Sequence, residues 1–263
     1  MGILTDYLGV QVKKLKYRFI ELTQPQLIDD IIKELDFKTN TKPTRTLDIS
    51  RKILNKDLSG NWHDETKFKS CSVIGKLNFI DKSTGAYIAY SMHQCACLSE
   101  DPRQSNNKSI NNFVRYVVHT KDKGLILEPK YHSFECWADT DFVRNWFKSE
   151  AQFSYNAACS SIGFVVTCAG FPIVWALKLQ GLISLRNNEV ECIALPKEMR
   201  EVVTIIQLMA DICKQGHDIY CKAPCSFCTA FEDNGGTLEI SRWPKMCPYT
   251  KNKHPVAPFT IIC

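Results

Sequence analysis

The chain has 263 residues, of which 44% are hydrophobic and 23% are charged, an ordinary composition for a soluble globular protein. This length can bury a sizeable core in one large domain or in two smaller ones. No stretch approaches the ~18 consecutive apolar residues that a membrane-spanning helix needs. The first ten residues also lack the basic and apolar segments of a secretory signal. We therefore expect no membrane association and a cytoplasmic or nuclear location.

The formal net charge of +5 is distributed unevenly. Residues 1–133 contain 21 Lys and Arg against 15 Asp and Glu, a balance of +6, whereas residues 134–263 contain 12 against 13, a balance of −1. A basic half joined to a near-neutral half suits a protein that binds a polyanion with one part and acts on it with the other. An excess of this size is also common in proteins that bind no polyanion.

Thirteen cysteines are present, and ten of them follow residue 133. Without a secretory signal, we expect them to be reduced thiols. Cys225 and Cys228 have the spacing of a zinc-ligand pair, with Cys221 and His217 upstream, but no second pair lies at the distance of a structural zinc site. Small core residues are the alternative explanation for several of these cysteines. We predict that Cys225 and Cys228 bind no zinc.

The first half predicts a β-hairpin at 7–22, a helix that begins at Pro25, a polar loop at 38–65 and helices at 70–98 and 106–120. The helices carry apolar residues at spacings of three and four, such as Leu27, Ile31 and Leu35. The acidic pair Asp29-Asp30 falls inside the first helix, where it is predicted to lie on a solvated face.

After Gly124 the pattern changes to that of strands. In residues 134–142, Cys136 falls on one face, whereas Trp137 and Asp139 fall on the other. The remaining elements are a hairpin formed by 162–170 and 171–180 with its turn near Ala169-Gly170, a helix at 188–215, and a strand that ends near Phe231. This order of elements predicts an α/β or α+β fold.

Three acidic residues fall where these elements could bring them together. Asp139 lies near the end of a strand, Glu191 lies on the apolar face of the helix, and Asp233 follows the last strand. Glu189 should point away from this group. Like charges repel at close range unless a divalent cation neutralises them, and two Mg²⁺ ions are a standard device for phosphodiester hydrolysis. The structural alternatives are an ordinary acidic turn at Asp233 and a carboxylate favoured by the helix dipole at Glu191.

Segments along nearly the whole chain, from about residue 6 to about residue 251, resemble one family in the same order. The second half resembles the ribonuclease H domain of Copia-type (Ty1/Copia) retrotransposon polyproteins in the segments WADTDF, GFVVTCAGFPIVWALKLQ, NNEVECIAL, FEDNGGTLEI and PKMCPYTK. The first half resembles the end of their reverse transcriptase in the segments DYLGVQV, LTQPQLIDDIIKEL, SVIGKLNFIDKST, IAYSMHQCA and VRYVVHTKDKGLIL.

The resemblance implies two regions. Residues 1–130 would be the C-terminal, thumb- or connection-like region of a reverse transcriptase, and residues 131–263 an RNase H-like domain with a mixed sheet flanked by helices and a degenerate end. The expected partners are an RNA–DNA hybrid and other products of the polyprotein. We expect Arg115, Lys121 and Lys178 to contact the nucleic acid.

The resemblance also implies a reaction. It assigns Asp139, Glu191 and Asp233 as the catalytic residues, which would bind two Mg²⁺ ions, or Mn²⁺ in their place, for hydrolysis of the RNA strand of an RNA–DNA hybrid.

The chain departs from the family pattern in several places. The paired aspartates of a polymerase active site have no counterpart, so we expect no DNA synthesis. Pro196 falls inside the predicted helix, five residues after Glu191, where the lost hydrogen bond to the Cys192 carbonyl costs ~3 kcal/mol. The tail after Lys251 lacks the family's ending, so no fourth metal ligand can be assigned. These departures predict weak or absent cleavage, and the alternative function is that of a catalytically inactive, nucleic-acid-binding remnant.

Overall fold

A computed structural model of the chain describes residues 4–37, 70–97, 107–130, 134–141, 159–181, 183, 187–216, 228–231 and 259–262. The chain divides into two compact units, residues 1–128 and residues 129–263, and each unit is treated by itself. The predicted loop at 38–65 lies outside the described residues, as do Asp233 and the cysteines Cys221 and Cys225.

The first unit contains a four-stranded antiparallel sheet in the order β1-β2-β3-β4. Its strands are β1 (Asp6–Tyr7), β2 (Val10–Lys14), β3 (Ile20–Thr23) and β4 (Leu125–Leu127). The predicted hairpin is confirmed as β2 and β3. Strand β4 was not predicted; it lies about 100 residues later in the sequence and pairs with β3. Gly124 allows that approach, since a Cβ atom there would lie 2.5 Å from the Leu22 carbonyl oxygen.

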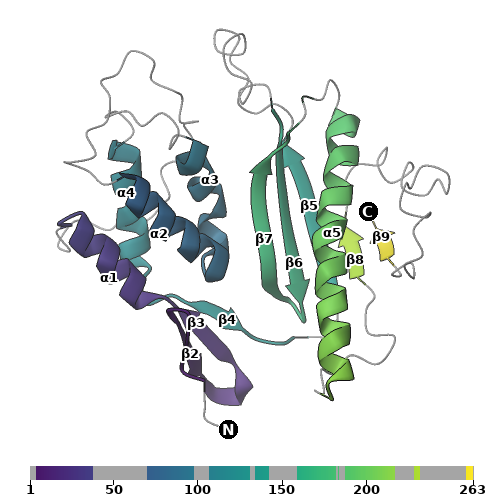
Figure 1. Cartoon of the computed structure of the whole chain (residues 1–263), viewed down its shortest axis with the longest axis horizontal. Helices are drawn as coiled ribbons and strands as arrows, with labels where there is room; N and C mark the ends of the chain where they lie inside the picture. Colours follow the sequence, from purple (N-terminus) through teal and green to yellow (C-terminus); the bar gives the residue numbers. More distant parts are fainter. Residues whose placement is uncertain are drawn as a thin grey trace. The chain divides into compact units, whose positions relative to one another are not determined.

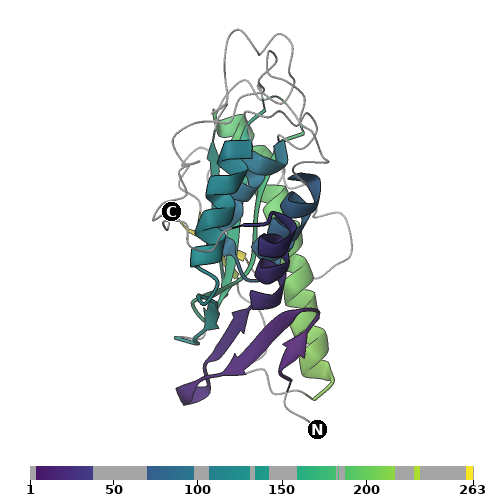
Figure 2. The same ribbon diagram turned by 90° about the vertical axis from the view of Figure 1, so that its left-hand side faces the viewer.

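The described helices of this unit confirm the predicted ones. They are α1 (Pro25–Glu34), α2 (Ser70–Ser83), α3 (Ala89–Cys97) and α4 (Asn107–His119), with the short 3-10 helices η1 (Lys16–Arg18) and η3 (Ala86–Ile88). The helix predicted at 70–98 is broken at Thr84-Gly85, where both backbone N–H groups donate to the Ile80 carbonyl oxygen. In both ribbon views the small sheet lies below the helices of the same unit (Figures 1 and 2).

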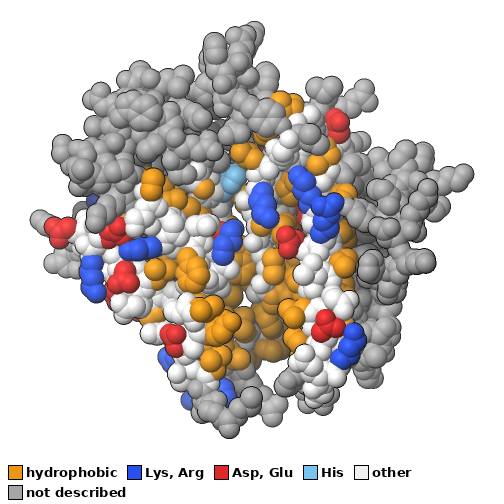
Figure 3. Space-filling model, in the orientation of Figure 1, with side chains coloured by type: hydrophobic (Ala, Val, Ile, Leu, Met, Phe, Trp, Pro, Cys, Tyr) orange, Lys and Arg blue, Asp and Glu red, His pale blue; other side chains and the backbone are white. Residues whose placement is uncertain are grey.

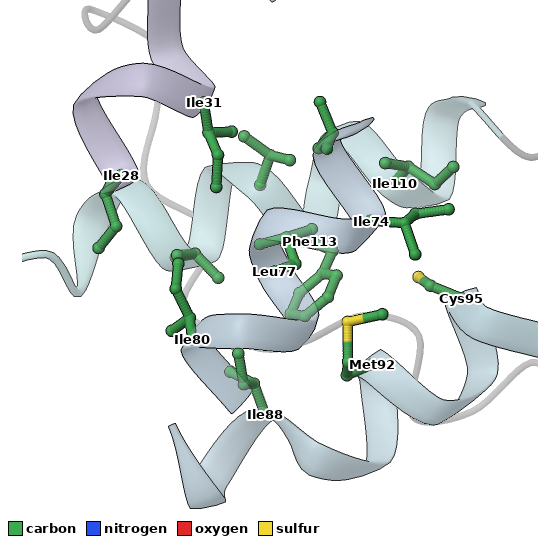
Figure 4. Close-up of a cluster of buried hydrophobic side chains, with 13 residues drawn as sticks. Ile28, Ile31, Ile74, Leu77, Ile80, Ile88, Met92, Cys95, Ile110 and Phe113 are labelled. Atoms are coloured by element: carbon green, nitrogen blue, oxygen red, sulfur yellow. The ribbon is translucent and has the colours of Figure 1, made fainter. Parts of the chain in front are cut away.

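An apolar core joins the four helices (Figure 4). It combines residues that the sequence spaces at three and four positions, such as Val73, Leu77 and Ile80 of α2, with Phe113 of α4. Phe113 is fully buried and lies in the middle of the cluster as drawn. This packing fixes the helices, whereas the β2–β3 hairpin contributes no residue to the core.

The second unit contains a five-stranded mixed sheet in the order β7-β6-β5-β8-β9. Its strands are β5 (Phe134–Asp141), β6 (Ser161–Cys168), β7 (Phe171–Leu179), β8 (Cys228–Phe231) and β9 (Phe259–Ile262). Strand β6 is antiparallel to both of its neighbours, whereas β5, β8 and β9 are parallel. The predicted fold class, an RNase H-like mixed sheet with helices, is therefore confirmed.

Two features of this sheet bear on the predictions. The β6–β7 turn lies at Ala169 (φ 53°) and Gly170 (φ 86°), as predicted. Strand β9 lies in the tail, for which the sequence predicts no element. The tail therefore supplies the fifth strand of the sheet.

One long helix, α5 (Asn187–Lys214), covers a face of this sheet (Figure 1). Val202 and Ile206 pack against Phe134 and Cys136 of β5 and against apolar residues of the neighbouring strands. The helix runs without a break through Pro196, whose ring is exposed. No described helix is both long and apolar enough to cross a membrane.

Candidate active site

The alternation predicted for β5 is present in the structure. Phe134 and Cys136 are buried in the core under α5, whereas Trp137 and Asp139 are exposed. Successive strand residues point to opposite faces of the sheet, so Asp139 shares the face of Trp137, not that of Cys136. This placement leaves the Asp139 carboxylate accessible from solvent, on the face of the sheet away from α5.

Strand β5, which contains Asp139, and strand β8, which precedes Asp233 in the sequence, are direct neighbours. Strands β5 and β8 are parallel, and Trp137 lies opposite Phe231. The two rings stack with a centroid separation of 3.9 Å and an interplanar angle of 10°. Asp139 follows Trp137 by two residues, and Asp233 follows Phe231 by two residues. Asp233 itself lies outside the described residues.

The third predicted ligand, Glu191, lies in the first turns of α5 and is 3% exposed. Glu189, two residues earlier, is exposed. The prediction that Glu191 shares the buried face of the helix and that Glu189 does not is therefore confirmed. Glu191 therefore offers a buried carboxylate at the position to which the resemblance assigns a metal ligand.

Gln180 holds the start of α5 beside Glu191. Its side chain is 1% exposed, and its Nε2 donates to the carbonyl oxygen of Val190 at 2.8 Å. Its backbone N–H donates to the Ser160 carbonyl oxygen at 2.8 Å, next to the first residue of β6. No role was predicted for Gln180 from the sequence. The available signal is an amide at the end of an apolar strand, because a buried amide needs hydrogen-bond partners.

A second buried carboxylate, Glu198, was also missed. It is fully buried and lies two turns after Glu191 on α5. The predicted apolar face includes Val202 but omits Glu198, which lies one turn earlier on the same side. Burial raises the pKa of the Cys136 thiol well above its usual range, and the nearby charge of Glu198 raises it further. The core of this unit therefore contains a carboxylate close to a thiol.

The thiols of this core are poor metal ligands. Burial raises the pKa of Cys228 to about 12, so this thiol stays protonated at neutral pH, and metals bind the thiolate. Within the described ranges, no group of three His, Cys, Asp or Glu side chains could hold a metal ion. Asp233 lies outside these ranges, so this absence does not bear on the carboxylate trio.

The three predicted nucleic-acid contacts have different surroundings. Lys121 forms an ion pair with Asp29, with 2.6 Å between Nζ and Oδ1, and so joins the turn after α4 to α1. The guanidinium group of Arg115 lies 6.0 Å from the centre of the Phe37 ring. Lys178 is exposed on β7. On the face that Figure 3 shows, basic and acidic side chains of the described residues are interspersed.

Comparison with known proteins places these residues in context. No protein-family model matches the chain. The chain is 22% identical over 218 residues to the retrovirus-related Pol polyprotein from transposon TNT 1-94 of Nicotiana tabacum, an alignment that covers 81% of this chain and 16% of the polyprotein. The chain therefore spans only about a sixth of that relative.

Among solved structures, a foamy viral protease-reverse transcriptase in complex with double-stranded DNA is similar at 13% identity and a TM-score of 0.38. This alignment covers 98% of the present chain and 37% of the viral chain. The resemblance predicted from the motifs is confirmed at this level: the chain is similar to a retrovirus-related Pol polyprotein from a transposon.

Proposed function

We propose that this chain hydrolyses the RNA strand of RNA–DNA hybrids, with Asp139, Glu191 and Asp233 as the ligands of catalytic Mg²⁺. The relationship to a Pol polyprotein and the mixed sheet with its covering helix support this proposal. The observation that carries it is the parallel pairing of β5 with β8.

That pairing sets the expected position of the two aspartates. Trp137 and Phe231 are partners in the register, and each is followed two residues later by an aspartate. If the register continues by two residues, the carboxylates of Asp139 and Asp233 lie side by side on one face. Such a pair repels unless a cation neutralises it.

The donor set suits the proposed ion. Mg²⁺ prefers oxygen ligands and is held by a small number of carboxylates. Asp139 supplies an accessible carboxylate on the face of the sheet away from α5, and Glu191 supplies a buried one at the start of α5, so the two would have to meet around the end of β5. Gln180 holds the start of α5 through the Val190 carbonyl. The bound ions would activate water and stabilise the leaving oxygen. The chain's own contribution is to hold the carboxylates in place and to bind the hybrid through its basic side chains.

Two features bear on the alternative of an inactive remnant. Helix α5 continues on both sides of Pro196, whose side chain is exposed, so the proline does not end the helix. The tail adds strand β9 to the sheet beside β8. Both features favour the active chain over the remnant and weaken the reasons for expecting no cleavage. We propose activity that is reduced rather than lost.

The test is cleavage of a labelled RNA–DNA hybrid by the purified chain in Mg²⁺. We expect slow cleavage that Asp139→Asn and Glu191→Gln abolish. The matched control is Glu189→Gln, because it removes one carboxylate from the same helix at an exposed position. Hybrid cleavage that survives both Asp139→Asn and Glu191→Gln would exclude the proposed site. Hybrid binding without cleavage, unchanged by Mn²⁺, would favour the inactive remnant.

A further inference from the structure

The turn between β2 and β3 has an unusual conformation for its sequence. A hydrogen bond of 2.8 Å from the Leu15 N–H to the Phe19 carbonyl oxygen closes the turn. Between these residues, Tyr17 has φ 60° and ψ 27°, in the left-handed region. Its side chain is 86% exposed. The turn therefore projects an aromatic ring into solvent.

Folding alone does not favour a tyrosine at this position. A residue other than glycine in the left-handed region costs roughly 1–3 kcal/mol, and asparagine tolerates this region better than tyrosine does. The Tyr17 ring gains little stabilisation from packing, since it is 86% exposed and lies 6.3 Å from the Phe19 ring, centroid to centroid, with a tilt of 52°. The fold of the hairpin therefore gives no reason for an aromatic side chain here.

The same turn is strongly basic. Residues 10–23 contain Lys13, Lys14, Lys16 and Arg18 against the single acid Glu21, a balance of +3 (4 − 1). The three lysines are exposed. Lys13 lies 3.8 Å from Glu21 but is 72% exposed, so this ion pair is weak. The lysines beside Tyr17 are available to an anionic partner.

We propose that residues 13–17, the basic–aromatic tip, bind single-stranded nucleic acid. A base would stack on the Tyr17 ring while Lys14 and Lys16 contact the adjacent phosphates. Proteins that bind single strands combine cations along the backbone with aromatic rings for the bases. In a duplex the base faces are covered, so an exposed ring adds nothing beyond the duplex ends. The inference rests on the proposed function only for the choice of nucleic acid as the polyanion.

The test measures affinity for a fluorescent oligo-dT strand and for a blunt duplex of the same length, in EDTA so that no metal-dependent cleavage occurs. We expect Tyr17→Asn to weaken strand binding roughly 5- to 100-fold, the range of one stacked base. Tyr17→Phe keeps the ring and should bind as the unmodified chain does. The aromatic control is Phe79→Ala, because Phe79 is 44% exposed on α2, away from the hairpin.

The lysines are tested in the same assay with a charge-matched control. Lys14→Ala/Lys16→Ala should weaken strand binding and reduce its dependence on salt, because each phosphate contact releases counterions. Lys33→Ala/Lys214→Ala removes the same charge from side chains that are 73% and 71% exposed elsewhere. An equal loss from both double variants would mean that only net charge matters, and would overturn the inference.

Folding and binding are separable at Tyr17. Because asparagine tolerates the left-handed region, Tyr17→Asn should leave thermal stability unchanged or raise it while binding falls. Unchanged strand binding by Tyr17→Asn, or an equal loss for strand and duplex, would contradict a single-strand site. Strand binding as expected without any hybrid cleavage would reject the proposed function and leave this inference standing. Cleavage with no effect of the tip variants would do the opposite.

Discussion

The two units treat their acidic side chains differently. In the first unit, Glu34 of α1 pairs with Lys76 of α2 at 2.5 Å, and the buried Asp81 pairs with Lys82 at 2.6 Å. In the second unit, Glu191 and Glu198 are buried on the face of α5 that meets the sheet, and the thiol of Cys136 lies near Glu198.

This difference separates a scaffold from a candidate site. In the first unit the Glu34–Lys76 pair joins α1 to α2 beside an apolar core, whereas Asp81 pairs with its neighbour within α2. Carboxylates within a core are seldom the most stable choice, since apolar residues of similar volume often stabilise a fold equally or more. Buried acids next to a strand with an exposed aspartate are therefore more informative about chemistry than about stability.

The largest expected effect tests the scaffold. Phe113→Ala removes a fully buried ring from the centre of the first core and should lower the free energy of unfolding of that unit by roughly 3–5 kcal/mol. Hydrogen exchange should show faster opening of α2 and α4. Protection in β5 and β6 should remain, and an equal loss there would contradict two separate cores.

A somewhat smaller effect, of opposite sign, tests the second unit. Pro196→Ala restores the missing N–H within an exposed part of α5 and should raise the free energy of unfolding by up to about 3 kcal/mol. Denaturant titration measures this change. The control is Lys197→Ala, the next residue, which is also exposed. No stabilisation by Pro196→Ala would show that the helix has already adapted to the ring.

Most of the helices and strands were predicted from local patterns, because their hydrophobic periodicity is visible in the sequence. The turn at Ala169-Gly170 and the length of α5 follow from alternation and from apolar spacing at three and four residues. Strands β4 and β9 were not predicted from these local patterns. Each is short and is stabilised by pairing with a strand distant in the sequence, which no local pattern records.

In the candidate site, too, local patterns were predictable from the sequence, whereas burial and strand pairing were not. Opposite burial of Glu189 and Glu191 follows from their positions on the helix. Glu198 and Gln180 were missed because polar residues on an apolar face are normally assigned to solvent, and only packing shows that they are buried. The pairing of β5 with β8 required the resemblance, because strand order is a property of the whole sheet.

A third prediction concerns the buried thiols. The pKa of Cys228 is raised to about 12 from the ordinary 9.0, chiefly by burial. The folded state therefore keeps the proton that the unfolded state loses above pH 9, so this contribution to stability is complete below pH 9 and disappears as the pH rises to about 12. At pH 10 the loss should be on the order of 1 kcal/mol.

The measurement is the free energy of unfolding between pH 8 and pH 10, compared with the Cys228→Ala variant. The variant should be less stable at pH 8 but should lose less on going to pH 10. At pH 8, iodoacetamide should modify the exposed Cys71 and spare Cys136 and Cys228. Parallel pH curves for the two proteins would show that Cys228 does not titrate differently in the folded and unfolded states.

The smallest effect lies at the ion pair between α1 and the turn that follows α4. Asp29 and Lys121 are 40% and 28% exposed, so a double-mutant cycle with alanine should give a coupling of only about 0.2–1 kcal/mol. The pair has a second consequence, because Asp29 competes with any phosphate for Lys121. Asp29→Ala should therefore strengthen nucleic-acid binding at low salt more than Asp30→Ala, which removes the same charge from the next residue and whose partner Lys33 lies at 3.8 Å. Equal gains from the two variants would show that Lys121 contributes no phosphate contact, and that the ion pair belongs to the scaffold alone.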